Sequence, residues 1–432
     1  MHGRRDRRTE AIYTEERLYK EYLRILHEEL KPAMGCTEPI AVAYAGALAR
    51  KTLGHLPERV TLTVSGNIIK NVKSVIVPHT GGRKGLRTAL AAGLLFGRAD
   101  KELEALSDVL PEQLSRLDEY CEGLSLTIER SDARNPFDIR VKAESAYVRI
   151  VGSHTNVVEI RNGDEEILSK PWEDCAVSVP ENRKLLTVRD IVEFADRVRV
   201  ADVEKLLDTQ IALNTAIAEE GMRGNYGAGI GKILLCSYGS GVQNRAKAYA
   251  AAGSDARMNG CEMPVVINSG SGNQGLTASL PVIIYGREMG ASREQLYRAL
   301  VVSNLVAIHL KTGIGTLSAY CGATSAGAGA GAGVAYLYGG KFREIAHTVV
   351  NALAINSGMI CDGAKSSCAA KIASAVEAGL LGMQMFMHDS QFYGGDGIVV
   401  KGVENTIRAV GELAREGMKE TDLEIIHLMM NT

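Results

Sequence analysis

The stretch Gly327-Ala-Gly-Ala-Gly-Ala-Gly333 contains no side chain larger than a methyl group. Its glycine spacing superficially fits a dinucleotide-binding fingerprint, but that motif needs a preceding strand, and residues 317–325 are small and polar. Glycine and alanine let two backbones approach closely. The stretch therefore predicts a helix in close contact with its neighbours rather than a nucleotide site.

Outward from this stretch, helical patterns dominate the chain from Thr187 onward, and glycine-rich loops separate them. These alanine-rich patterns cover residues 188–199, 203–220, 246–252, 293–311, 342–355 and 369–381. The preceding part of the chain differs, because β-rich runs with turn residues between them occupy 60–64, 74–77, 124–128, 139–148 and 157–160. Helical patterns at 85–98 and 101–110 interrupt these runs.

Two further helices, at residues 15–29 and 40–53, resemble the C-terminal half more than the β-rich part. We therefore expect an α+β protein, in which a smaller α+β domain with an antiparallel sheet is inserted into a mainly α-helical domain. The predicted divisions are residues 1–55, whose helices pack on the helical domain, the inserted domain 56–186, and the helical domain 187–432. This last domain is interpreted as the catalytic one.

The composition limits the class of protein. A chain of 432 residues with 46% hydrophobic residues and a net charge of −2 suits a globular protein of two or three domains, with neither nucleic acid nor an anionic membrane as partner. The longest uncharged stretch, residues 312–340, holds nine glycines and is interpreted as packed interior rather than a membrane span. No export signal is evident, so we expect a cytoplasmic location and eight cysteines that are free thiols or metal ligands.

Three cysteines sit among small residues in the C-terminal third: Cys321, Cys361 and Cys368. On one continuous helix the Cα atoms of Cys361 and Cys368 would lie about 10.5 Å apart, which is far for two ligands of one cluster. Gly363 argues against such a helix, and a loop over 361–365 followed by a helix from about residue 366 would bring the thiols together near a helix N-terminus. If the three thiols bind a metal-based group, one coordination position of that group stays open. Alternatively, the cysteines are buried apolar residues with no ligand.

A fourth cysteine and a polar loop accompany these thiols. Cys36 lies in Gly35-Cys-Thr-Glu-Pro39 just before a helix, where it could be a fourth ligand, a general base or a structural thiol. Residues 268–275 follow an apolar run and combine free backbone N–H groups with polar side chains. Such a segment can bind a carboxylate or a phosphate. The alternative is an ordinary flexible loop. The polar side chains in question are those of Ser269, Ser271, Asn273 and Gln274.

Several basic residues are weaker candidates. His309 and Lys311 lie at the end of a helical run, just before the Cys321 segment. They could transfer a proton or bind a charged group of the substrate. Alternatively, they are structural cations that the helix dipole favours at a C-terminus. His79 and His154 lie between β-rich runs and are interpreted as turn residues, although either could reach an interface between domains.

Taken in order along the chain, these motifs resemble those of L-cysteine desulfidase proteins in the UPF0597 group, which are relatives of the iron–sulfur L-serine dehydratase alpha chain. The resemblance covers the chain after about residue 15. It implies β-elimination of L-cysteine to pyruvate, ammonia and hydrogen sulfide without pyridoxal phosphate. It also implies a 4Fe–4S cluster with one open iron, bound by Cys321, Cys361 and Cys368.

The resemblance also suggests roles for the other residues. Cys36 would be the base and Glu38 would orient it, while His309 and Lys311 would assist proton transfer. Substrate carboxylate and ammonium would be held by Ser269, Ser271, Asn273 and Gln274. Serine dehydratases use a C-terminal cysteine as an extra ligand, and no cysteine follows Cys368 here, which favours the desulfidase branch.

Some alternatives stay open. L-serine dehydration, or an iron–sulfur or zinc sensor without catalysis, would use the same cysteines. The expected partner is a small amino acid substrate, and the small-residue helical surface is compatible with a homodimer.

Overall fold

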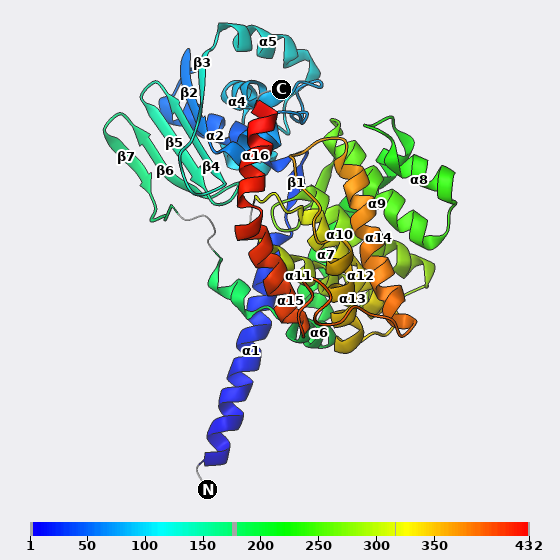
Figure 1. The fold of residues 1–432 in the computed structure, drawn as a ribbon. Coiled ribbons are helices and arrows are strands. Elements are labelled where there is room, and N and C mark those ends of the chain that lie inside the picture. The colour runs from blue at the N-terminus through cyan, green and yellow to red at the C-terminus, as the bar shows by residue number, and fades with distance from the viewer. Residues whose placement is uncertain (1–2, 175–178, 316, 431–432) are drawn as a thin grey trace.

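The computed structural model describes residues 3–174, 179–315 and 317–430. A mainly helical part lies beside a smaller part that contains a six-stranded sheet (Figure 1). This arrangement confirms the predicted α+β class. Across the described ranges, no helix combines the length and apolar character needed to cross a membrane.

The glycine-rich stretch forms the middle of α12 (Gly322–Leu337), which packs between α11 (Arg293–Ile314) and α14 (Cys368–Met387). A Cβ atom added at Gly327 or Gly331 would overlap the backbone of Ala375 or Gly379 in α14. The alternate glycine, Gly329, faces α11, where a Cβ would lie 2.5 Å from the carbonyl oxygen of Ser303. The predicted close helix contact is therefore confirmed.

The remaining helices surround this centre. Their bounds are α6 (Val188–Arg197), α7 (Val200–Arg223), α8 (Ile230–Tyr238), α9 (Val242–Met258), α10 (Gly272–Glu288), α13 (Phe342–Ile355), α15 (Val403–Glu412) and α16 (Lys419–Met430). The six predicted ranges all fall on helices to within a few residues, but the pattern at 246–252 is only the middle of α9. α8, α10, α15 and α16 were not predicted, and α10 escapes detection because it opens with Gly-Asn-Gln-Gly and contains Pro281.

The sheet has the strand order β3-β2-β4-β5-β6-β7. The strands are β2 (Arg59–Val64), β3 (Ser125–Arg130), β4 (Asp138–Ala143), β5 (Ala146–Val151), β6 (Val157–Asn162) and β7 (Glu165–Ser169). β2 and β3 are parallel, whereas the other pairs are antiparallel, so the sheet is mixed rather than wholly antiparallel. The parallel pair is possible because the long β2–β3 connection contains α3 (Gly66–Val72), α4 (Gly85–Phe96) and α5 (Leu114–Gly123).

Three predicted elements of this part need correction. Residues 74–77 are not a strand, since Ile76 makes only an isolated bridge and the apolar side chains pack into the interior. The run 139–148 is a hairpin of β4 and β5, turned at Glu144, which has a φ of 53°. The helical pattern at 101–110 yields only a short 3₁₀ helix, η1 (Ala99–Glu104), followed by turns.

The N-terminal helices divide between the two parts. α1 (Gly3–Glu29) contacts α7 and α11, but α2 (Thr37–Leu53) packs on α4 and on the sheet strands β4 and β5. Gly93 of α4 lies so close to Ala43 of α2 that a Cβ there would overlap its backbone. The expectation that residues 1–55 pack as one unit on the helical domain is thus wrong for α2, whose small residues fit α4 instead. The boundaries at 55 and 186 remain predictions.

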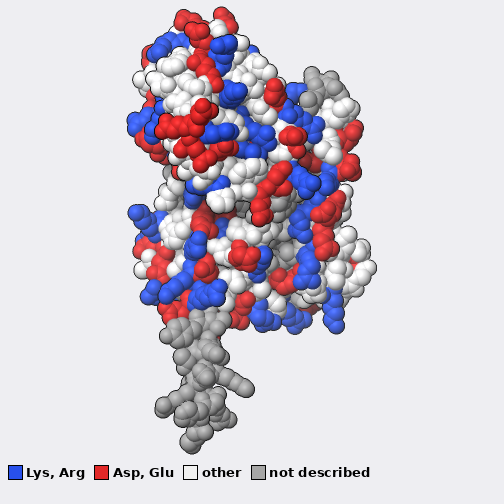
Figure 2. Space-filling model, turned by 90° about the vertical axis from the view of Figure 1, so that its left-hand side faces the viewer, with Lys and Arg blue, Asp and Glu red and all other residues white. Residues whose placement is uncertain are grey.

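Two short connections tie the parts together. β1 (Pro32–Met34) pairs antiparallel with β8 (Pro264–Val266), so the segment before Cys36 runs beside the segment before Asn268. The C-terminal helix α16 returns to the sheet part and contacts α3 (Figure 1). On the face seen in Figure 2, acidic and basic side chains are interspersed, which agrees with the near-neutral net charge.

Replacing Gly331 by alanine tests the close packing of α12. The added methyl group would press on the backbone of Gly379, which cannot rotate away, so we expect a loss of about 2 kcal/mol in the free energy of unfolding. Urea unfolding, monitored by circular dichroism, measures this loss of stability. Gly123→Ala is the control, since nothing lies within 4 Å of a Cβ at this exposed end of α5. Equal stability of the two variants would contradict the packing argument.

Candidate functional site

A cavity of about 110 Å³ lies where the sheet part meets the helical part. The sheet part and α2 contribute Cys36, Glu38, Lys70, Asn71 and His154. The helical part contributes Arg257, the first residues of α10 and α12, and residues around Cys361 and Cys368. Ten of the eleven sequence-predicted site residues line this one cavity: Cys36, Glu38, Ser269, Ser271, Asn273, Gln274, Lys311, Cys321, Cys361 and Cys368.

Backbone pairing brings Cys321 and Cys361 side by side. The amide of Cys321 donates to the carbonyl of Met359 at 2.9 Å, and the amide of Cys361 donates to the carbonyl of Ala319 at 2.6 Å. The side chain of Cys321 interacts with that of Cys361, and this interaction lowers the pKa of the Cys361 thiol. These bonds fix the two thiols on adjacent segments that are 40 residues apart in the sequence.

Helix packing brings the third thiol, that of Cys368, to the same end of the helical part. Cys321 is the N-cap of α12, and Cys368 is the first residue of α14. The contacts of Gly327 with Ala375 and of Gly331 with Gly379 show that α12 and α14 run parallel, so both helices begin at the same level. The predicted loop over 361–365 is confirmed, with Gly363 at a φ of 92°, although α14 begins at Cys368 rather than near residue 366.

Hydrogen bonding and nearby cations favour a negative charge at Cys361. The hydrogen bond from Cys321 lowers the pKa of Cys361, and the ammonium groups of Lys70 and Lys311 lower it further, against the effect of burial. The same hydrogen bond and burial raise the pKa of Cys321. Burial lowers the pKa of Lys311 to about 8.

The donor set fits a group held by thiolates. Two parallel helix N-termini and two buried lysines surround three thiols, and each of these features stabilises negative sulfur. All seven described cysteines are free; Cys175 lies outside the described residues. Within the described ranges, no three His, Cys, Asp or Glu side chains are close enough together to hold a single metal ion. A multi-iron cluster takes one thiolate per iron and so spaces its ligands more widely.

Cys36 lies beside these thiols but in a different environment. It is the N-cap of α2, and its thiol donates to Glu38 Oε2 at 3.0 Å. It packs with Val75, Met258 and Cys368, and burial followed by the charge of Glu38 raises its pKa. In this structure Cys36 is therefore a protonated thiol that is already bonded to a proton acceptor.

The polar segment 268–275 is not a flexible loop, which corrects one of the two sequence interpretations. Asn268 and Ser271 form a tight turn, in which Ser269 has a φ of 51°, and α10 begins directly after it at Gly272. The free N–H groups predicted there are those of a helix N-terminus. Gln274 lies against Gly322, where a Cβ would be 2.6 Å from its amide carbon, and its Oε1 atom is buried without a hydrogen-bond partner.

His309 does not reach the cavity, so the sequence-based grouping with Lys311 is wrong. Its Nε2 atom lies 2.7 Å from Glu404 Oε2, and that contact ties α11 to α15. Two residues along a helix turn the side chain by about 200°, which puts the neighbouring Lys311 on the opposite face. Lys311 faces the cavity, where its ammonium group donates to the carbonyl of Gly315.

Lys70, His154 and Arg257 line the cavity but were not predicted as site residues. Lys70 is buried in α3, where its ammonium group lies 2.5 Å from Asp422 of α16 and 3.4 Å from the carbonyl oxygen of Cys361. His154 lies in the turn between β5 and β6, 4.0 Å from Glu38 Oε1, and burial lowers its pKa. Nothing in the local sequence marks these residues, apart from the possible interface role considered for His154.

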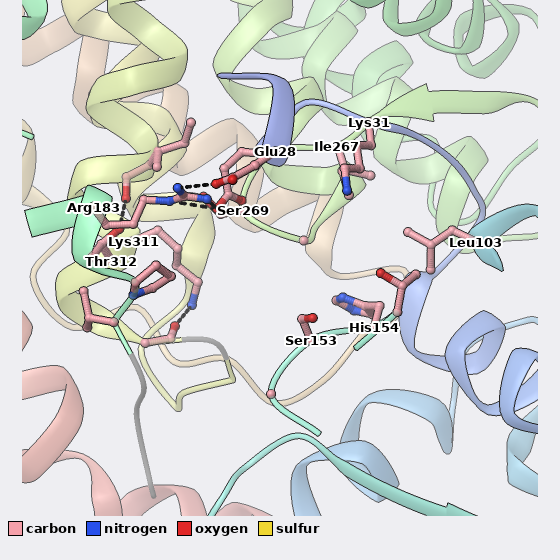
Figure 3. Close-up of a pocket in the computed structure, with 18 residues that line it drawn as sticks. Glu28, Lys31, Leu103, Ser153, His154, Arg183, Ile267, Ser269, Lys311 and Thr312 are labelled. Atoms are coloured by element: carbon pink, nitrogen blue, oxygen red, sulfur yellow. Dashed lines mark hydrogen bonds and ion pairs between the residues drawn. The ribbon is translucent and has the colours of Figure 1, made fainter. Parts of the chain in front are cut away.

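A second cavity, of about 340 Å³, adjoins the first (Figure 3). The two share His154, Ser269, Gly270 and Lys311 as walls. Its far side is formed by Glu28 and Arg183, whose side chains pair at 2.7 Å. This arrangement offers a small molecule a route towards the thiols.

The chain is similar to known proteins over most of its length. A family model described as the serine dehydratase alpha chain matches residues 100–427. A UPF0597 protein of Desulfitobacterium hafniense is 56% identical over 421 residues, which is 96% of this chain and 98% of the relative. UPF0597 proteins of Lachnoclostridium phytofermentans and Treponema denticola are 47% and 44% identical, over 96% and 95% of this chain and 100% and 98% of their own lengths.

Replacing Asp422 by alanine tests the contact between α16 and the thiol-bearing loop. Lys70 would keep its charge in a buried position without a carboxylate, so we expect a loss of about 3 kcal/mol in the free energy of unfolding. The double variant Lys70→Met with Asp422→Ala should recover part of it, because no charge is then buried. Glu16→Ala, which breaks an exposed pair with Lys20, should leave the urea midpoint unchanged. A double variant no more stable than Asp422→Ala alone would contradict this account.

Proposed function

The chain belongs to the serine dehydratase alpha chain family, and from this premise we propose that it is a lyase that eliminates the β-substituent of an L-amino acid, with L-cysteine as its substrate. The observation that carries the proposal is the meeting of three thiols and an anion-binding helix N-terminus in one cavity. The products would be pyruvate, ammonia and hydrogen sulfide.

Cys321, Cys361 and Cys368 would hold a 4Fe–4S cluster, which would take the place of pyridoxal phosphate in the reaction. When bound, such a cluster supplies a Lewis acid that stabilises charge on the leaving sulfur. The chain contributes buried ammonium groups at Lys70 and Lys311, which favour negative charge in the same region.

The substrate carboxylate would bind at the start of α10. The first N–H groups of this helix are free to donate, and the partial positive charge of the helix end attracts an anion. Ser269, Ser271, Asn273 and Gln274 would complete the polar contacts with the carboxylate and the ammonium group. The larger adjoining cavity would be the entry route.

Cys36 and Glu38 would accept the α-proton together. As the Cα–H bond breaks, Cys36 Sγ takes that proton while its own proton passes to Glu38 Oε2, 3.0 Å away. The electrons of the Cα–H bond form the Cα–Cβ double bond, and the C–S bond breaks to release sulfide. Aminoacrylate then tautomerises to an imine, and water hydrolyses it to pyruvate and ammonia.

L-Serine is the second candidate substrate, because the matching family is described as a serine dehydratase. The carboxylate, the ammonium group and the α-proton are the same in serine and cysteine, so the residues proposed for them serve either substrate. The leaving group is the difference, and the rate of pyruvate release from each amino acid decides between them.

Anaerobic preparation tests the cluster and the reaction on one sample. We expect about four irons and four acid-labile sulfides per chain, with sulfide released from L-cysteine. Cys361→Ala should lose both the iron and the activity, whereas Cys236→Ala, which changes an exposed thiol on α8, should keep both. A cluster without turnover on cysteine or serine would favour a sensor. No cluster after anaerobic reconstitution would overturn the proposal.

Replacing Cys36 by alanine separates a base from a ligand. We expect the iron content to stay normal and turnover to fall by about 10²-fold or more, because the proton acceptor at the α-carbon is lost. Glu38→Gln should also retain iron and slow the reaction, because it removes the group that accepts the thiol proton. Loss of iron in the Cys36→Ala variant would instead make Cys36 a cluster ligand.

A further inference from the structure

Arg257 is a buried cation without a counter-ion among the described residues. It lies in the last turn of α9, is 3% exposed, and lines the cavity that holds the thiols. Its Nη1 atom donates to Asn273 Oδ1 at 3.2 Å, while its Nε atom has no hydrogen-bond partner. The two other buried arginines of the described chain, Arg149 and Arg183, both form ion pairs with carboxylates.

This position is electrostatically unfavourable without an anion. The guanidinium lies directly over the N-terminus of α10, so close that a Cβ at Gly272 would overlap its Nε atom. A helix N-terminus carries partial positive charge, so two positive groups face one another in a buried space. A buried charge without a partner costs several kcal/mol, which an anionic ligand would offset.

Among the described residues, the guanidinium of Arg257 donates a hydrogen bond to Asn273 and to none of the three thiols proposed as cluster ligands. The charge of Arg257 lowers the pKa of Cys36, the thiol proposed as the base, against the larger effects of burial and of Glu38. Cys36, Val75 and Met258 form a small apolar cluster, against which Cys368 packs. Arg257, Cys36 and Cys368 all line the one cavity in which the carboxylate, the α-hydrogen and the β-substituent of an amino acid would bind.

We propose that Arg257 binds the α-carboxylate of the substrate and thereby restricts the site to amino acids with a free carboxylate. The flat guanidinium donates two parallel hydrogen bonds to a carboxylate, which fixes the plane of that group as well as its place. Asn273 Oδ1 accepts a hydrogen bond from Nη1 of Arg257 and so helps to hold the guanidinium in place. This inference rests on the proposed function for the identity of the ligand but not for the existence of the anion site.

Binding of L-alanine, which has the carboxylate but no leaving group, tests the inference without turnover. Isothermal titration of the anaerobically prepared full chain should show that Arg257→Met raises the Kd for L-alanine by about 30-fold or more. Arg257→Lys should recover only part of the affinity, since an ammonium group cannot donate as a fork. The wild-type protein should bind L-alanine methyl ester much more weakly than L-alanine, and Arg257→Met should bind the two alike.

Stability separates a binding residue from a structural one. Because Arg257 lacks a counter-ion, unliganded Arg257→Met should unfold at the same temperature as the wild-type protein or higher, with unchanged iron content. Arg287→Met, at the exposed opposite end of α10, is the control and should bind L-alanine normally.

Two outcomes would overturn the inference: a Kd for L-alanine in Arg257→Met within twofold of wild type, or a lower unfolding temperature together with loss of iron. Failure of the proposed function looks different. A wild-type protein that neither releases sulfide nor dehydrates serine but binds L-alanine through Arg257 would leave this inference standing.

Discussion

The close approach of α12 to α14 is the constraint on which the site depends. Gly327 and Gly331 allow carbonyl groups of α14 to lie where other residues carry a Cβ, and the two helices consequently run parallel at short range. Because α12 begins at Cys321 and α14 at Cys368, their packing also sets the distance between two thiols. The helix ends converge on these thiols with their positive poles, so the same contact provides both geometry and charge.

The cavity is completed by residues from the sheet part. The side of the cavity formed by the sheet part consists of Lys70 and Asn71 from α3 and His154 from the β5–β6 turn. Asp422 of the C-terminal helix forms an ion pair with Lys70. Each group thus depends on a segment that is distant in the sequence. The lysine that favours a thiolate at Cys361 also holds α16 in place, which couples the chemistry of the site to the docking of the last helix.

Sequence reasoning reached the helical half and most of the site because both leave local signals. Alanine-rich periodicity marked the packed helices, and cysteines among glycines marked the thiols. Where contacts between distant segments determine the secondary structure, the local sequence pattern does not predict it. Residues 74–77 look like a strand, yet their apolar side chains are buried without a partner strand. α10 looks like a loop, because its first turn, Gly-Asn-Gln-Gly, has a low propensity to form a helix.

The same limit explains the errors at the site. His309 and Lys311 are neighbours in sequence, and only the helix rotation between them shows that one faces Glu404 and the other the thiols. Arg257 looked ordinary because an arginine near a helix C-terminus is common. Its importance arises from its surroundings: it is buried, it lies against a helix N-terminus, and it forms no ion pair with a carboxylate of the described residues.

The glycine content of α12 also has a consequence for the order in which the protein forms. Each interior glycine costs about 1 kcal/mol relative to alanine in an isolated helix, so α12 has little tendency to form before its neighbours are present. α14 is synthesised after α12, so the packing of α12 can be completed only when the ribosome has released most of the chain. Cys321 and Cys368 would meet at that late moment, and any group that needs both thiols must be delivered to a nearly complete protein.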